Sequence, residues 1–295
     1  MNIEDIKFTC GENSFQKAGI ERNDKTINYE ISGNVGYVEL LSAVKGLNLI
    51  SEFYDVNAVC TVKASGIIAV ALGQSLADAV RKTMDSNPID FISAMIVASS
   101  EVDSEVVMFL KDTNIIVAPS FTKNAVEYLE RKGITYITIK TPLKDYKKYI
   151  SNEIKVTPLG TFTQTPNLSE LDKDLFKVVS KTKPTVEQIE DAVFAWKVAK
   201  HIDSQSIVVV KDLKTTAIAQ GLHSASIEFA MDYSCDLSKD AILASDMPIT
   251  NCDVDIAAQG RIGLMILPTA TKDIIDKVDK YQIGLITTGF TNIKI

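Results

Sequence analysis

Arginine and histidine are scarce in this chain. It has four arginines among 31 basic residues, and two histidines among 295 residues. Arginine supplies the planar guanidinium that binds a phosphate or carboxylate through two parallel hydrogen bonds. With so few of them, the anionic groups of a ligand would have to be held by lysine, serine, threonine and backbone N–H groups. The arginines are Arg22, Arg81, Arg131 and Arg261.

Positive charge is in deficit as well. The 31 basic residues face 38 acidic ones, so the formal net charge is −7, and the isoelectric point is near 5.0. Nucleic-acid binding depends on cations that neutralise the phosphate backbone. The composition therefore argues against a nucleic-acid partner.

Metal-binding and membrane motifs are missing too. The cysteines Cys10, Cys60, Cys235 and Cys252 have no metal-ligand spacing, and two histidines cannot complete a local zinc cluster. No apolar run approaches the ~18 residues of a membrane span, and the first ten residues lack the apolar region of a secretion signal. We expect a reduced cytoplasmic protein without zinc and without a membrane partner. Walker and dinucleotide-binding glycine loops are absent.

What the chain does contain is an alternation of short apolar runs with amphipathic segments, the pattern of α/β layers. Its length favours two domains or one large one, and its 46% apolar content is enough for a sizeable core. In the first half the pattern predicts strands and helices. The strands are expected at Ala58–Lys63, Ser93–Ala98, Asn114–Pro119 and Thr135–Lys140, and the helices at Leu76–Asp85, Ser104–Lys111 and Lys123–Lys132, the last ending at Gly133.

The second half comes after a segment, Tyr149–Pro184, whose prolines indicate a connection with one short edge element. The second half opens with a capping-box pattern, Thr185–Gln188, that predicts a long helix through about His201. Four strands are then expected, at Ser206–Lys211, Ala241–Ser245, Gly263–Leu267 and Ile283–Thr287.

The two halves repeat one pattern. A strand ending at Lys63 and a second ending at Gly73 correspond to a strand ending at Lys211 and a second ending at Gly221, each 148 positions later. We interpret this as an internal duplication of a strand, strand, helix unit. Chance similarity between two hairpin-plus-helix units is the alternative.

Five short motifs along the chain resemble one family, in the same order and with similar gaps. The family is the AICAR transformylase part of the bifunctional purine biosynthesis protein, AICAR formyltransferase/IMP cyclohydrolase. The cyclohydrolase part has no counterpart in this sequence. The motifs are Phe8–Gln16 (resembling LRYGENPHQ), Val62–Gly73 (VKHxNPCGVAxG), Phe194–His201 (FAWKVVKH), Leu243–Asp246 (LASD) and Ile283–Gly289 (IAMVFTG).

The resemblance implies an α/β fold of two tandem cytidine-deaminase-like α/β/α subdomains, each a three-layer sandwich, over residues 1–160 and 161–295. It also implies a homodimer with active sites at the subunit interface. Zinc chemistry is not implied, because the H-x-E and P-C-x-x-C motifs of the zinc deaminases are absent.

In the family, a formyl group moves from 10-formyltetrahydrofolate to the amine of AICAR, with the help of a Lys-His pair. Lys63 stands at the lysine position, but Ala64 stands at the histidine position. Loss of a general base typically costs about a hundred- to ten-thousand-fold in rate. His223, at the start of a predicted helix, is the candidate replacement base. The plainer interpretations are a strand-end lysine that reaches water and a partly exposed loop histidine.

Other positions depart from the family where charge would hold the nucleotide. Thr9 and Ala225 replace motif arginines, and the family's terminal RHFRH reads Thr291–Ile295 here, with Lys294 as one point charge. Gln205, at an asparagine position, and Asp253 remain as candidate substrate-binding residues.

Three oxygen-bearing side chains correspond to ligands that the family places around a monovalent cation: Ser204, Ser206 and Asp246. Hard oxygen ligands suit such an ion. Alternatively, the serines only end a helix and begin a strand, and Asp246 only caps the segment after it.

Two functions therefore stay open. One is an AICAR transformylase in which Lys63 and His223 act. The other is a relative with a degenerate active site, weak or inactive in formyl transfer, that binds a nucleotide or folate or serves as a dimeric interaction protein. Three losses of about 2 kcal/mol each would remove some four orders of magnitude in rate. The residues favour the degenerate relative.

Overall fold

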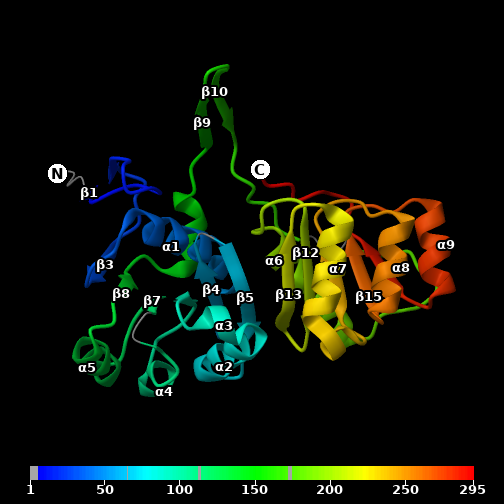
Figure 1. The fold of residues 1–295 in the computed structure, drawn as a ribbon, viewed down its shortest axis with the longest axis horizontal. Coiled ribbons are helices and arrows are strands. Elements are labelled where there is room, and N and C mark those ends of the chain that lie inside the picture. The colour runs from blue at the N-terminus through cyan, green and yellow to red at the C-terminus, as the bar shows by residue number, and fades with distance from the viewer. Residues whose placement is uncertain (1–5, 65, 112–113, 172–174) are drawn as a thin grey trace. The chain divides into compact units, whose positions relative to one another are not determined.

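The structure is a computed structural model that describes residues 6–64, 66–111, 114–171 and 175–295. The chain forms two compact units. Unit 1 contains Met1–Gly66, Gln74–Ala77 and Ile89–Ser169, and unit 2 contains Ile67–Gly73, Asp78–Pro88 and Glu170–Ile295. Both combine strands with covering helices, so the fold is α/β, as predicted (Figure 1).

Unit 1 is built on a sheet with the strand order β4-β6-β7-β8-β3. β6, β7 and β8 are parallel, whereas β4 and β3 join the two edges of this group in antiparallel sense. The elements are β1 (Ile6–Phe8), β2 (Ala18–Ile20), β3 (Tyr29–Ser32), α1 (Tyr37–Ile50), η1 (Ser51–Phe53), β4 (Ala58–Lys63), α3 (Pro88–Phe91), β6 (Met95–Ala98), α4 (Ser104–Val107), β7 (Ile115–Ala118), α5 (Lys123–Lys132), β8 (Tyr136–Ile139), η2 (Leu143–Tyr149), β9 (Glu153–Thr157) and β10 (Gly160–Gln164).

Unit 2 is built on a sheet with the order β11-β16-β15-β14-β12-β13-β5. β14, β15 and β16 are parallel, and β12 joins β14 in antiparallel sense. The elements are β5 (Gly66–Leu72), α2 (Leu76–Ser86), β11 (Lys177–Val178), α6 (Val186–Ala199), β12 (Ser206–Lys211), β13 (Lys214–Gln220), α7 (His223–Ser234), η4 (Cys235–Ser238), β14 (Ile242–Ser245), α8 (Asn251–Gln259), β15 (Leu264–Leu267), α9 (Lys272–Lys280) and β16 (Gly284–Thr287).

The pairing pattern of unit 1 recurs in unit 2. β4-β6-β7-β8 and β12-β14-β15-β16 share the same order and the same sense at each pairing, one antiparallel pair followed by two parallel pairs. In the chain, β4, β5 and α2 correspond to β12, β13 and α7. This is the strand, strand, helix order that the duplication predicts. The likeness to cytidine deaminase stays a prediction.

Helices cover both faces of the unit 2 sheet. Ile207 and Val209 of β12 point into a core that also holds Ile227 of α7, Val254 of α8 and Ile274 of α9. Residues between them, such as Val208, are buried on the opposite face because side chains alternate along a strand. α6 packs against β12 and β14. Its capping box at Thr185 and Gln188 forms as predicted.

The turn between β12 and β13 is held by one half-buried carboxylate. Asp212 and Leu213 both have positive φ, at 55°, which suits the right-handed twist of a tight hairpin. Their N–H groups donate to the Asp191 carboxylate of α6 at 3.0 and 2.7 Å. Burial nevertheless raises the pKa of Asp191, with these hydrogen bonds opposing the rise.

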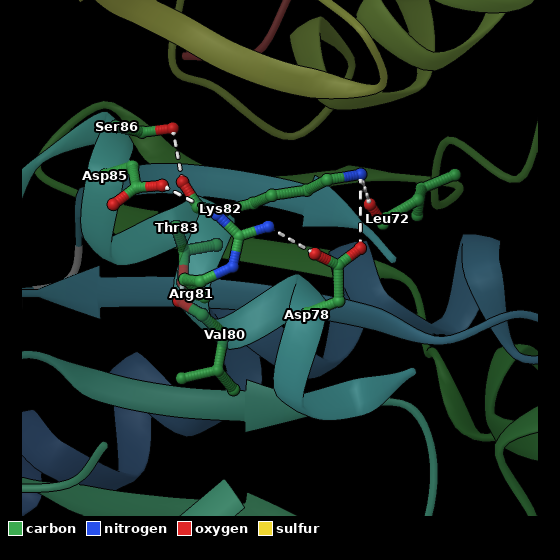
Figure 2. Close-up of polar contacts among 8 residues, drawn as sticks. All are labelled: Leu72, Asp78, Val80, Arg81, Lys82, Thr83, Asp85 and Ser86. Carbon is green, nitrogen blue, oxygen red and sulfur yellow. Dashed lines mark hydrogen bonds and ion pairs between the residues drawn. The ribbon is translucent and has the colours of Figure 1, made fainter. Parts of the chain in front are cut away.

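Within unit 2, α2 is fastened to the end of β5 by a lysine, as Figure 2 shows. Lys82 donates from Nζ to the Leu72 carbonyl at 2.9 Å and lies 3.5 Å from Asp78. Arg81 bridges Asp78 at 2.6 Å and Asp85 at 3.2 Å on the same helix (Figure 2). Both ion pairs of Arg81 are therefore with carboxylates of its own helix, α2.

One prediction was wrong. The segment expected to hold a single short edge element contains the hairpin β9-β10 in addition to β11, which pairs with the edge of β16. The hairpin residues are exposed throughout both strands. In β9 the apolar Ile154 and Val156 alternate with polar residues, so a strand pattern was present. The prolines among Thr, Asn and Ser in this segment favoured a connection instead. In the described chain no helix is long and apolar enough to cross a bilayer.

Candidate functional site

Ser204 and Asp246 form the centre of a buried polar joint in unit 2. The Ser204 hydroxyl donates to Asp246 Oδ2, and the backbone N–H of Ser206 donates to Asp246 Oδ1 at 2.9 Å. Asp246 has no exposed surface. It comes directly after β14 and Ser206 begins β12, so the antiparallel β12-β14 pairing brings the two together.

The chain end completes this joint. The Ser204 N–H donates to the Lys294 carbonyl at 2.8 Å, and the Lys294 N–H donates to Ser204 Oγ at 2.9 Å. The joint therefore fixes the α6-β12 connection to the last residues of the chain. We define the Ser204 joint as Ser204, Ser206, Asp246 and the backbone of Lys294.

The oxygens of the joint have suitable chemistry for the predicted monovalent cation, but a cation needs lone pairs directed at one point. The hydroxyl of Ser204 instead faces the carboxylate of Asp246, and the Ser206 hydroxyl donates to the Ala199 carbonyl at 3.4 Å. The set does not fit a cation in this arrangement. Across the described residues, no group of three or more His, Cys, Asp or Glu side chains is placed to hold a metal ion.

Asp253 is separate from this joint and is engaged in capping α8. Its Oδ2 accepts from the N–H and hydroxyl of Thr250 at 2.7 and 2.8 Å, and its Oδ1 accepts from the Ser224 hydroxyl at 2.7 Å. The residue has no exposed surface. A carboxylate with these partners ties the start of α7 to the start of α8.

Gln205 directly precedes β12, and His223 follows the end of β13 by three residues. The Gln205 carbonyl accepts from the Gly221 N–H at 3.1 Å, which links the start of β12 to the end of β13. His223 is the first residue of α7. Its side chain lies outside the part of the chain that the structure describes.

Lys63 belongs to unit 1 and ends β4. Its ammonium group lies 2.8 Å from the Asp90 carboxylate of α3, and both side chains are about two-fifths exposed, at 40% and 41%. Ala64 is next, with φ 47°, a left-handed conformation that favours residues other than alanine. The Lys63 side chain therefore forms an ion pair that is partly exposed to solvent, as expected for a lysine at the end of a strand.

Comparison with known proteins decides the family. Residues 2–232 match the family described as the AICARFT/IMPCHase bienzyme. The chain belongs to this family. Curated relatives carry the name bifunctional purine biosynthesis protein PurH. One from Acetivibrio thermocellus is 29% identical and aligns with 99% of this chain, and one from Fusobacterium nucleatum is 31% identical and aligns with 100% of it.

The chain spans a little over half of these bienzyme relatives. The match covers 59% of the Acetivibrio thermocellus protein and 61% of the Fusobacterium nucleatum protein. A PurH from Anoxybacillus flavithermus, 28% identical, gives a similar share of 58%. This agrees with the resemblance to one part of a two-part enzyme.

Within this family member, every arginine contacts a group away from the Ser204 joint. Arg81 bridges two carboxylates of α2, and Arg261 pairs with Asp236 at 3.0 Å. Arg22 and Arg131 lie over the rings of Tyr29 and Tyr128, at 4.6 and 5.5 Å from the ring centroids.

Lys294, the remaining candidate cation, is also engaged. Its Nζ lies 3.7 Å from Asp203, and the two side chains are partly exposed. In water such a pair is weak. An anionic ligand group would compete with Asp203 for this one charge.

Sequence reasoning missed several partners of the candidate residues. Thr250 forms a capping box with Asp253, and the Thr-x-x-Asp spacing was a readable signal. No local pattern pointed to Ser224 or to Asp90, because each meets its partner only through the tertiary fold.

Proposed function

We propose that this chain is a relative of AICAR transformylase in which formyl transfer is weak or absent. The observation that carries the proposal is the state of the cationic side chains. Lys63 is paired with Asp90 and followed by Ala64, and the arginines contact carboxylates and rings elsewhere. A transferase for a nucleotide needs preorganised cations and a general base.

The reaction to be tested takes its substrates from the family resemblance. The amine nitrogen of AICAR attacks the formyl carbon of 10-formyltetrahydrofolate and forms a tetrahedral oxyanion. The bond to the folate nitrogen then breaks, and the proton released by the amine ends on that nitrogen. In this chain Lys63 would act beside the formyl oxygen, and His223 would take the proton.

The decisive assay mixes the purified chain with AICAR and 10-formyltetrahydrofolate and monitors folate absorbance. We expect a rate well below the ordinary enzyme range of about 1–1,000 per second. Ala64→His restores a Lys-His pair at a position with positive φ, which histidine adopts more readily than most residues. It should raise any residual rate at least tenfold. An ordinary rate for the unaltered chain would contradict the proposal.

Two controls define that assay. Lys63→Met should abolish the gain produced by Ala64→His, because the pair then lacks its lysine. Lys45→Met alters a lysine of α1 instead and should leave the gain intact. If Ala64→His leaves the formyl-transfer rate unchanged while the protein stays folded, the missing cationic side chains alone limit the rate.

The alternative function, binding without transfer, is tested by thermal unfolding in AICAR or folate. A ligand that binds the folded state raises the midpoint as its concentration passes Kd. A rise without turnover supports nucleotide or folate binding. Gln205 and Asp253 are the proposed contacts, and Gln205→Ala should reduce the rise.

The cation that the resemblance implies at Ser204, Ser206 and Asp246 does not fit the observed arrangement, and a separate experiment tests it. For an ion to bind, the Ser204 hydroxyl would have to turn from Asp246. Unfolding midpoints in potassium chloride and in choline chloride at equal ionic strength test it. A potassium-specific rise that Ser204→Ala removes supports the ion, and equal midpoints contradict it.

We also propose a homodimer, and the hairpin β9-β10 supports it. This hairpin pairs only with itself in the described chain, yet it carries apolar side chains with large exposed fractions. They are Ile154, Val156, Leu159 and Phe162. Apolar groups clustered on an exposed element are typical of a surface that a partner covers.

A further inference from the structure

A pocket beside α1 in unit 1 shares no residue with the proposed formyl-transfer site or with the Ser204 joint. Its volume is about 340 Å³, within the range of small-molecule sites. It is bordered by α1, by β8 and the start of β3, by the loop before β3, and by η2 with the residues just after it. Binding in this pocket can therefore be tested separately from formyl transfer.

One face of α1 forms a wall of the pocket. Leu40, Val44, Leu47 and Asn48 line it, at the spacing of three and four residues that places side chains on the same side of a helix. Leu47 is buried, whereas Val44 stays 48% exposed. The apolar face of α1 is therefore wider than the part that packs into the core, and the remainder is open to a ligand.

The other walls of the pocket are aliphatic and aromatic. Ile137 and Ile139 lie two residues apart on β8, and therefore on the same face of that strand. Tyr146 and Tyr149 come from η2. Because burial of apolar surface is favourable in proportion to its area, walls of this kind favour a compound with an apolar ring.

Charge is nearly absent from the described residues that line the pocket. Lys25 is their charged member, and this residue is exposed to solvent. An ion pair with an exposed lysine is weak, and apolar walls do not replace the water that a charged ligand gives up. The pocket therefore favours an uncharged ligand.

Asn48 supplies a hydrogen-bond donor at this pocket. Its Oδ1 accepts from the Tyr146 hydroxyl at 3.1 Å, which leaves the two N–H bonds of Nδ2 to other partners. Within the described chain Nδ2 makes no hydrogen bond. It keeps accessible surface, since it is not one of the buried polar atoms that lack a partner. A ligand can therefore reach this donor.

We propose that the pocket binds an uncharged ring compound that carries one hydrogen-bond acceptor, such as an aryl ketone. The ring packs against Val44 of α1 and the isoleucines of β8, and the carbonyl oxygen accepts from Asn48 Nδ2. The bond from Tyr146 to Asn48 Oδ1 fixes the amide in the orientation that presents Nδ2. This preorganisation lowers the entropy that binding would otherwise cost.

The test is equilibrium dialysis of the full chain against probes that share one naphthalene ring: 2-acetylnaphthalene, naphthalene and 2-naphthoate. The ketone should bind with a Kd below about 1 mM, and the naphthoate at least about tenfold more weakly, because its charge loses water. Asn48→Asp keeps the acceptor for Tyr146 and removes the donor. It should weaken ketone binding about three- to tenfold and leave the Kd of naphthalene within about twofold of its original value.

Two tryptophan variants of α1, both checked for an unchanged circular dichroism spectrum, locate the bound ketone. Val44→Trp adds bulk at a half-exposed lining position and should abolish binding. Leu41→Trp adds the same bulk on the same helix at a residue that is 39% exposed and outside the lining, and it should bind the ketone like the unaltered chain.

Three results would overturn the site itself: no binding of the ketone to the unaltered chain, undiminished binding to Val44→Trp, or an equal loss in Val44→Trp and Leu41→Trp. Equal affinities for the ketone and the naphthoate would overturn the assignment of an uncharged ligand. Unaltered ketone binding in Asn48→Asp would overturn the assignment of the donor.

Discussion

At the residue scale, Asp246 has no exposed surface and accepts hydrogen bonds from the Ser206 amide and the Ser204 hydroxyl. Its place in the Ser204 joint gives it a structural task whether or not a ligand binds there. Asp253 has the same character, with Thr250 and Ser224 as its donors. Both carboxylates hold connections that follow strands of unit 2.

We predict that Asp246→Ala destabilises the protein by about 2–3 kcal/mol, because a charged acceptor is lost and the Ser206 N–H stays buried without a partner. Asp203→Ala removes the acid that directly precedes Ser204, whose side chain is 45% exposed and lies 3.7 Å from Lys294. It should cost less than about 1 kcal/mol. Urea unfolding monitored by circular dichroism measures both, and equal losses would argue against the joint.

Cys60 of β4 predicts how stability depends on alkaline pH. Burial raises the pKa of its thiol far above the ordinary value, with Lys45 opposing the rise. The folded state therefore keeps a proton that the unfolded state releases near pH ~8.5. The resulting stabilisation is complete below that pH and falls by up to about 1.4 kcal/mol per pH unit above it.

Cys60→Ala removes this contribution, so its stability should fall less steeply between pH ~8.5 and ~10. Urea unfolding at several pH values gives the two slopes. Burial also raises the pKa of Tyr146, and that group adds to the decline in both proteins at higher pH. Parallel slopes for variant and parent would show that the Cys60 thiol does not contribute.

At the element scale, equivalent helices in the two units end in the same way with different residues. After α5, Gly133 has φ 67° and the Ile134 N–H donates to the Leu129 carbonyl at 2.9 Å. After α9, Gln282 has φ 59° and the Ile283 N–H donates to the Val278 carbonyl at 2.9 Å. Both are left-handed helix ends, but only the first uses the residue that adopts this conformation without strain.

We predict opposite effects of substitution at these two positions. Gln282→Gly should raise stability by about 1 kcal/mol, since it relieves a side chain held at positive φ, and Gly133→Ala should lower it by about as much. Gln282→Ala keeps the strain and serves as the neutral control. Unfolding midpoints in urea measure all three. A loss of stability in Gln282→Gly would contradict this account.

Sequence patterns located most of the central strands and missed elements without such patterns. Ala58–Lys63 and Ser206–Lys211 match β4 and β12 residue for residue. The helix predicted at Ser104–Lys111 ends at Val107. α1 was not predicted, and its N-cap, Gly36, makes no side-chain capping bond. The local signals used to recognise a helix start are absent there.

At the scale of the whole molecule, the hairpin β9-β10 is a two-stranded sheet of its own and pairs with none of the strands of the two repeats. Val156 and Phe162 are 82% and 57% exposed. They point to opposite faces of the hairpin, since Phe162 pairs with Lys155 rather than with Val156. Because these apolar side chains stay exposed on both faces, they add little to the stability of the folded chain.

We predict that Val156→Ser/Phe162→Ser keeps the fold but shifts the protein from dimer to monomer. The double variant removes apolar area that the fold does not use, so the circular dichroism spectrum should not change. Light scattering after size exclusion, over a range of concentrations, measures the mass. Thr163→Ser is the hairpin control and should leave the mass unaltered. A monomeric parent would refute the dimer.

Residue identity and local spacing are enough to predict the family motifs, the duplicated strand, strand, helix order and the scarcity of arginine. The contacts of those residues depend on the folded chain. Lys63 meets Asp90 27 positions away, and Ser204 meets Asp246 42 positions away, through strand pairing that local periodicity does not encode. The same holds for Tyr29, an ordinary strand residue in the sequence whose hydroxyl is buried without a hydrogen-bond partner in the folded chain.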